Sequence, residues 1–273
     1  MKISISLVLI VFISGIGLRA GAQKLPNVQQ KSLRAPANVK VDGKATEWSG
    51  TFQAYNHATD IYYTICNDDQ NLFAVMKVTD PEVIYQLINS GITLSIQIGT
   101  GAKVAITYPQ SESRNKFYIN VKDKPVIKAG DPATVAAADS FSIAANKKLQ
   151  VIPAFKQIGV TGVANVDSSI SIYNENKIKA AAAFDNTMTY IYELSIDLKN
   201  LGLQPGDIKT LAYKVQVNET NKAGLLDNRP GFNIVRDANG TIQSFSIAPG
   251  ATPPPKGSGA ATNFTGEYTL AKN

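Results

Sequence analysis

The chain has 273 residues and a formal net charge of +6 at pH 7, and 44% of its residues are hydrophobic. This charge is mild and the lysines are scattered, which excludes the dense basic patch of a nucleic-acid-binding protein. The one cysteine, Cys66, excludes an intrachain disulfide. Because Cys66 ends the alternating run IYYTIC, we expect it to be buried as a small apolar side chain.

Residues 1–22 have the pattern of a secretory signal peptide. Lys2 supplies the positive start, residues 3–17 carry no charge, and Ala20-Gly21-Ala22 forms a small-residue cleavage site. The apolar run is shorter than the ~20 residues that a membrane-spanning helix needs. We therefore expect a secreted or periplasmic protein that begins near Gln23 and has no membrane span after cleavage.

Period-two alternation of apolar and polar residues predicts many short strands in chain order. These are residues 60–66, 72–78, 92–98, 104–108, 117–121, 169–173, 178–184, 189–197, 211–218, 242–247 and 266–270. Short strands at regular spacing, separated by turn residues, are typical of an antiparallel β-sandwich. The sequence therefore predicts an all-β fold.

One short helix is expected near residues 81–90. Asp80 is its predicted N-cap, Pro81 suits the first helical position, and Gly91 ends it before the next strand. Residues 122–148 and 219–240 are weakly patterned and are expected to be long loops. Residues 251–263 are rich in Pro, Gly and Ser and lack a core-forming pattern. We expect residues 23–35 to form an N-terminal extension and residues 36–273 to form one domain.

The residues that most often carry catalysis are scarce. His57 is the only histidine, and no G-x-S-x-G motif accompanies it, so neither a Ser-His-Asp site nor a His/Cys zinc site is indicated. A pair of carboxylates for glycoside hydrolysis has no sequence signature. We predict that the protein is not an enzyme and assign no catalytic or metal-binding residues.

Two further segments have a structural and a functional interpretation. The turn NDDQN, residues 67–71, offers oxygen ligands for calcium, but a hairpin turn with Asx hydrogen bonds explains the same residues without a metal. Met76 and His57 are haem-ligand types, but core packing is the ordinary role of a methionine after LFAV. We predict no cofactor and retain calcium as the alternative at the turn.

Several motifs resemble, in order, those of a carbohydrate-binding module family 9-like (CBM9-like) domain, a β-sandwich related to the DOMON domain. They are VDGKATEW, NDDQNLFAVMKVTDP, GITLSIQI, YIYELSIDLKNLGL, LAYKVQVNE and FTGEYTL, and they span roughly residues 36–270. The resemblance implies a jelly-roll-like sandwich. The best understood members of the family bind the ends of sugar chains, so the resemblance also implies carbohydrate binding.

The sugar-binding members of that family resemble one another in a pair of tryptophans that clamp a sugar ring. The corresponding segments here contain Tyr85 and Phe264 as their only aromatic residues. The resemblance thus implies a weak or degenerate sugar site, with Tyr85 as its ligand-binding residue. Tyr85 is one position from the apolar helix face, so we expect it at the rim, partly exposed. Trp48 matches the opening motif, where structural packing is favoured over the alternative of sugar stacking.

These observations lead to two hypotheses. The first is an exported, non-catalytic binding protein of CBM9-like fold whose expected partner is carbohydrate. The alternative is a structural or interaction protein of the cell envelope without a sugar site. Exposed aromatic rings grouped on a shallow surface favour the first hypothesis, and aromatic rings that are all buried or isolated favour the second.

Overall fold

The computed structural model describes residues 24–272, apart from 49, 51, 102, 112–115, 205, 221–231, 237–241 and 250–258. The expected signal peptide, residues 1–22, and most of the Pro/Gly-rich segment therefore lie outside the described residues. Side chains of β11 and β12 are described only at a few positions.

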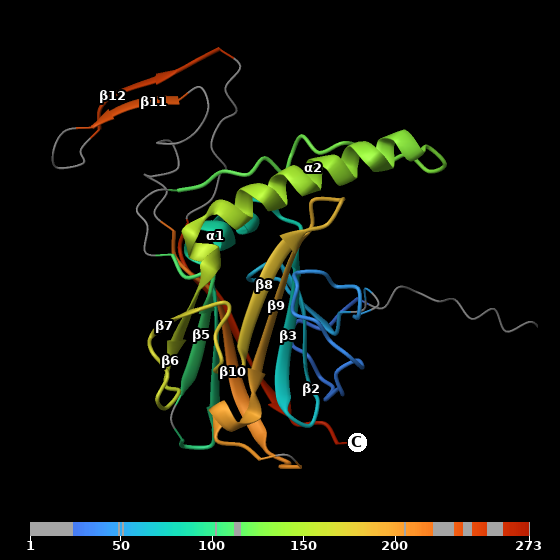
Figure 1. Cartoon of the computed structure of the whole chain (residues 1–273), viewed down its shortest axis with the longest axis vertical. Helices are drawn as coiled ribbons and strands as arrows, with labels where there is room; N and C mark the ends of the chain where they lie inside the picture. The colour runs from blue at the N-terminus through green and yellow to red at the C-terminus, as the bar shows by residue number, and fades with distance from the viewer. Residues whose placement is uncertain are drawn as a thin grey trace, which may run out of the picture.

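Two antiparallel sheets pack face to face (Figure 1). The five-stranded sheet has the order β1 (Ala54–Asn56), β2 (Ile61–Asn67), β3 (Asn71–Val78), β9 (Tyr190–Asp197) and β8 (Ile178–Phe184). The six-stranded sheet has the order β13 (Thr262–Thr269), β10 (Thr210–Val217), β4 (Ile92–Ile98), β5 (Val104–Tyr108), β6 (Gln157–Thr161) and β7 (Ser169–Ser171). A separate pair joins β11 (Phe232–Arg236) to β12 (Ile242–Ile247). The predicted all-β sandwich is confirmed, while its jelly-roll character stays a prediction.

The main core fills the space between the two large sheets. Strand alternation builds it: on β10, Leu211, Tyr213 and Val215 are buried, whereas Ala212 and Lys214 face outward. Apolar residues from both sheets and both helices belong to this one cluster. The core is therefore shared by the whole sandwich.

The predicted helix is α1 (Pro81–Ser90), at one end of the sandwich (Figure 1). Asp80 accepts hydrogen bonds from the backbone N–H groups of Glu82 and Val83 at 2.8 and 2.9 Å. Gly91 closes the helix with φ +74° and donates to Leu87. The expected cap, start and stop are confirmed.

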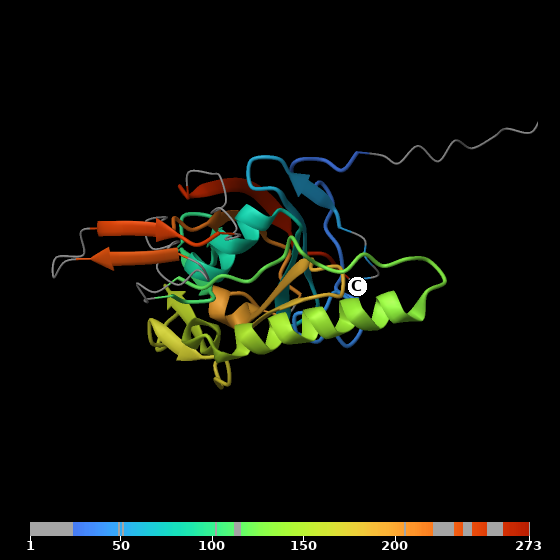
Figure 2. The same ribbon diagram turned by 90° about the horizontal axis from the view of Figure 1, so that it is seen from above.

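The prediction of a loop over residues 122–148 is wrong, because α2 (Pro132–Val151) occupies most of it. Asp131 caps the helix, Pro132 starts it, and alanines favour it. Its buried face consists of three small side chains and one leucine, namely Ala138, Ser142, Ala145 and Leu149. The helix therefore has only a weak amphipathic pattern in the sequence. Figure 1 and Figure 2 show α2 lying across the end of the sandwich that also holds α1, above the turn between β8 and β9.

Other element predictions also need correction. Residues 117–121 do not form a strand, although Ile119 and Val121 are buried in the main core. The expected loop over 219–240 contains β11, and the short β1 was not predicted. Neither was β6, where Gly159 interrupts the alternation. A Cβ at Gly159 would lie 3.2 Å from side-chain atoms of Gln110 and Thr107, so the glycine leaves room for these two side chains.

The N-terminal segment covers the outer face of the five-stranded sheet (Figure 1). It helps build a second apolar cluster that consists of Trp48, Phe52, Cys66, Phe73, Val75 and Ile191. The side-chain amide of Gln29 donates to the carbonyl of Ile65 at 2.7 Å and accepts from its N–H at 2.8 Å. Arg34 forms a parallel bridge with Asn67. The segment expected as an extension is therefore hydrogen-bonded to β2.

Candidate functional site

Trp48 lies inside the second apolar cluster and is only 7% exposed. Its indole Nε1 donates to Glu193 Oε1 at 2.7 Å, and its ring contacts Phe73 edge-on, with centroids 6.4 Å apart. The backbone N–H groups of Asp42 and Gly43 donate to Glu193 Oε2 at 2.9 and 2.8 Å. Three residues of the opening motif therefore donate hydrogen bonds to one buried carboxylate. The expectation that Trp48 packs inside the protein is confirmed.

Tyr85 is 6% exposed, so its expected position at a partly exposed rim is wrong. The buried face of α1 is wider than the sequence indicates, because Lys116 and Phe117 contact its last turn at Asn89. The Asn89 amide donates to Phe117 O at 2.8 Å and accepts from Phe117 N at 2.6 Å, which holds that segment in place. Tyr85 as a ligand-binding residue stays a prediction.

A different group of rings lies at the surface of the five-stranded sheet. Tyr55 pairs with Tyr62 across β1 and β2, and Tyr62 pairs with Lys77 across β2 and β3. The rings of Tyr55 and Tyr62 have centroids 4.4 Å apart and planes 32° apart. The exposed His57 ring stands at 87° to Tyr55, with a centroid distance of 4.6 Å. We name Tyr55, His57 and Tyr62 the surface ring cluster.

Polar groups border the surface ring cluster. The Lys77 ammonium lies 4.3 Å from the centroid of Tyr62 in a cation–π contact. The Tyr55 hydroxyl donates to Asp60 Oδ1 at 2.6 Å. This hydrogen bond, followed by burial and the Asp60 charge, raises the pKa of Tyr55 to about 12, so the hydroxyl stays protonated at neutral pH. The surface thus combines aromatic area with a hydroxyl, a carboxylate and an ammonium group.

Sequence reasoning missed the surface ring cluster because its geometry depends on a hairpin with a three-residue strand. Asn56 Oδ1 accepts from the N–H groups of Ala58 and Thr59, and Asp60 has φ +54°, which turns the chain back onto β1. The only signal was tyrosine on both sides of this Asn- and Asp-containing turn. Without β1, nothing placed Tyr55 beside Tyr62.

The other candidate residues have structural surroundings. Asp68 Oδ1 accepts from the N–H groups of Gln70 and Asn71 at 2.7 and 2.6 Å, the Asx hydrogen bonds expected of the hairpin turn. Met76 is fully buried and Cys66 is 1% exposed, as their core assignments predict. In the part of the chain that the structure describes, no three His, Cys, Asp or Glu side chains group as metal ligands. Calcium at the turn stays the alternative to the prediction of no cofactor.

No protein-family model and no curated protein matches the chain. The resemblance to CBM9-like domains therefore stays a prediction that rests on the motifs themselves. Among the described residues, neither helix combines the length and the apolar composition that crossing a membrane requires.

Proposed function

We propose that the protein is an exported, non-catalytic binding protein whose ligand is carbohydrate and whose contact surface is the surface ring cluster. The observation that carries this proposal is the cross-strand placement of Tyr55 and Tyr62 beside the exposed His57. Sugar rings have apolar faces, and aromatic side chains remove these faces from water. The Asp60 carboxylate and the Lys77 ammonium are the hydrogen-bonding groups that sugar hydroxyls need.

The outer face of the six-stranded sheet is a less suitable sugar surface. It contains a hollow of about 340 Å³ lined by polar residues that include Ser95, Gln97 and Lys214. Tyr213 is the only aromatic residue of this lining, and it is 3% exposed. Hydrogen bonds exchanged with water contribute only ~0.5–1.5 kcal/mol each. This hollow therefore lacks the stacking surface that the surface ring cluster offers.

We expect the affinity to be weak. Tyr55 and Lys77 pack on the half-buried Tyr62, so the area left for a ligand comes mainly from Tyr55 and His57. Two partly exposed rings and a few hydrogen bonds are consistent with millimolar dissociation constants, which correspond to ~4 kcal/mol.

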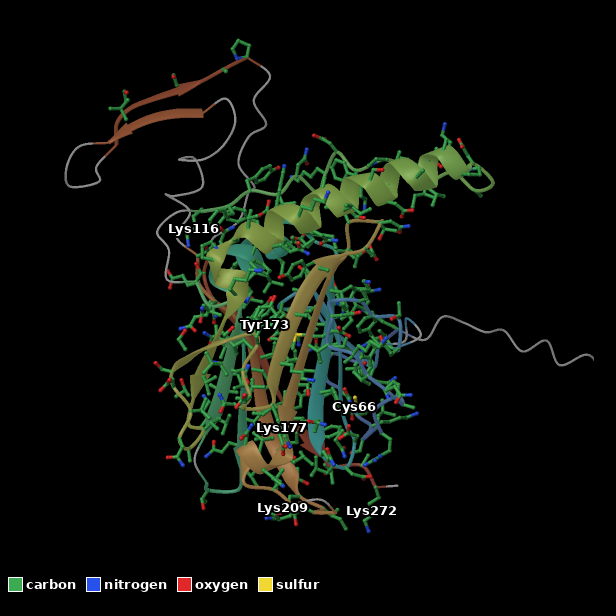
Figure 3. All side chains as sticks on the ribbon, in the orientation of Figure 1. Cys66, Lys116, Tyr173, Lys177, Lys209 and Lys272 are labelled. Carbon is green, nitrogen blue, oxygen red and sulfur yellow. The ribbon has the colours of Figure 1, made fainter. Side chains whose placement is uncertain are left out.

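A glycan array followed by NMR titration of the purified protein tests this proposal. We expect Tyr55→Ala and His57→Ala to reduce sugar binding at least fivefold. Tyr173→Ala is the matched control, because Tyr173 is 79% exposed and lies outside the surface ring cluster (Figure 3). Binding that survives Tyr55→Ala and His57→Ala would overturn the assigned surface. No binding of any glycan at millimolar concentration would favour a structural or interaction protein instead.

A further inference from the structure

A second hollow lies at the end of the sandwich opposite α1. β3 ends at Val78, next to α1, and Val78 pairs with Tyr190 at the start of β9. The last residue of β9, Asp197, therefore lies at the end of the sandwich far from α1 (Figure 1). There Gly101 from the turn between β4 and β5, the loop between β6 and β7, and the 3-10 helix η2 (Leu198–Leu201) line an open hollow of about 440 Å³. This volume is within the range of small-molecule sites, ~300–1,000 Å³.

The inner wall of this hollow is aliphatic. Val104, Val163 and Leu201 line it and are 5%, 9% and 8% exposed. Ile98 adds a half-buried side chain that packs against the main core. The lining contains no aromatic residue, so the hollow offers no ring on which a sugar could stack. Its wall instead suits a short hydrocarbon chain.

The rim of the hollow is positively charged. Lys199 is exposed and lines the hollow beside Asn200. The nearest acid along the chain, Asp197, is held by Lys177 Nζ at 3.1 Å and by the backbone N–H of Lys199 at 2.9 Å. Among the described residues, the Lys199 ammonium forms no ion pair within 4.0 Å, although its charge also helps to lower the pKa of Asp197. It can therefore pair with an anionic group at the mouth.

The walls of the hollow are fixed by backbone contacts. Gly162 has φ +79°, and a Cβ there would lie 2.1 Å from the carbonyl oxygen of Lys103, so only glycine lets the two loops touch. Gly202 has φ +71° and donates to Lys199 O at 3.0 Å, which closes η2. The Asn200 amide donates to Asn176 O at 2.7 Å. Because the loops around the hollow are already fixed, binding a ligand does not require the entropic cost of ordering them.

We propose that this hollow binds a small aliphatic carboxylate, with its hydrocarbon chain against Val104, Val163 and Leu201 and its carboxylate beside Lys199. The aliphatic wall selects against a bare sugar, and the single unpaired ammonium selects a monoanion over a cation. This site is separate from the surface ring cluster, so it does not depend on the proposed sugar binding.

NMR titration of the purified protein with octanoate tests this inference. We expect octanoate to shift the methyl signals of Val104, Val163 and Leu201. Butanoate should bind more weakly, because each buried methylene contributes up to about fourfold in affinity. Lys199→Gln should weaken octanoate binding about two- to fivefold, the range of an exposed ion pair, and should leave octanol binding unchanged. Lys147→Gln, an exposed charge change on α2, is the matched control.

A blocking variant tests the aliphatic part of the site separately. Ala164 is an exposed lining residue, so Ala164→Phe should fill the hollow and abolish octanoate binding while thermal stability is retained. Three results would overturn the inference. They are the absence of methyl shifts at millimolar octanoate, equal weakening by Lys199→Gln and Lys147→Gln, and unchanged binding by a folded Ala164→Phe variant.

Discussion

Trp48 and Glu193 are joined by a 2.7 Å hydrogen bond from the indole Nε1 to the carboxylate, across 145 residues of sequence. Glu193 is 1% exposed, and burial raises its pKa against the opposing effect of its hydrogen bonds. Three N–H donors, from Trp48, Asp42 and Gly43, satisfy its two oxygens. A buried carboxylate is tolerated only with such partners, so this contact fixes the N-terminal segment on the sheet.

Replacement of Trp48 by alanine should strongly destabilise the protein. The change removes a buried aromatic ring and one donor to Glu193, and we expect a loss of about 3 kcal/mol or more in the free energy of unfolding. Trp48→Phe should cost less, because the ring contact with Phe73 is partly kept. Urea denaturation measures both variants, and Tyr173→Ala serves as an exposed aromatic control. An unchanged melting temperature combined with lost sugar binding would instead make Trp48 a ligand residue.

Glu193→Gln should also be destabilising, although it removes a buried charge. A glutamine side chain has one acceptor oxygen and one NH₂ group, whereas all three neighbours of Glu193 are donors. The NH₂ group of the glutamine must therefore face one of these N–H donors, and neither group then has an acceptor. An unsatisfied buried polar group costs about 1–3 kcal/mol. Urea denaturation at pH 7 provides the measurement. A Glu193→Gln variant as stable as the natural protein would show that these donors do not need both oxygens.

The two expectations for aromatic residues show what the sequence can predict. The packing of Trp48 was predicted because Trp48 matches a structural opening motif and large aromatic rings are usually buried. Its partner Glu193 was not predicted, because a contact across 145 residues has no local signature. Tyr85 was misplaced because helix spacing alone defines one apolar face, whereas a second segment packs beside Asn89. The surface ring cluster and the aliphatic hollow both depend on how distant loops meet. The periodicity of a single helix or strand does not predict contacts between loops that are distant in sequence.

Tyr190→Phe and Tyr192→Phe should leave stability unchanged or increase it. Both hydroxyls are buried, and neither has a hydrogen-bond partner in the described part of the chain. Removal of an unpaired buried hydroxyl relieves its desolvation cost, which is about 1–3 kcal/mol in proteins. Tyr268→Phe is the matched control, because the Tyr268 hydroxyl lies 2.7 Å from Asn67 Oδ1 and 2.8 Å from Leu33 O.

Thermal denaturation of the three variants separates these cases. Tyr268→Phe should lose about 1 kcal/mol, the net contribution of the one hydrogen bond that its hydroxyl donates. Equal losses in all three variants would show that Tyr190 and Tyr192 also make hydrogen bonds in solution.

The Cys66 thiol should be unreactive in the folded protein. Burial, followed by the nearby Asp68 charge, raises the pKa of Cys66 to about 12, so almost no thiolate forms at pH 8 (Figure 3). We expect a disulfide reagent to modify Cys66 only in urea concentrations that unfold the protein. Modification of the native protein at the rate of a free peptide thiol would contradict this burial.

Asp197 should make the stability dependent on pH in the acidic range. Burial opposes its ionisation, but the hydrogen bond from Lys199 N and the pair with Lys177 outweigh burial and lower the pKa of Asp197. A carboxyl group with a lowered pKa in the folded state stabilises the protein above its ordinary pKa of ~3.9. That stability is lost as the pH falls through the lowered value.

Asp197→Asn isolates this contribution. Asparagine can still accept from Lys199 N but cannot pair with the Lys177 ammonium, so we expect a loss of about 1 kcal/mol at pH 7. The difference from the natural protein should shrink as the pH falls below ~3.9, because the unfolded chain then takes up the proton, and it should vanish below the lowered pKa of the folded state. Urea denaturation of both proteins between pH 7 and pH 2.5 measures it, with Lys177→Met as the partner in a double-mutant cycle. A difference that does not change with pH would show that the charge of Asp197 plays no part.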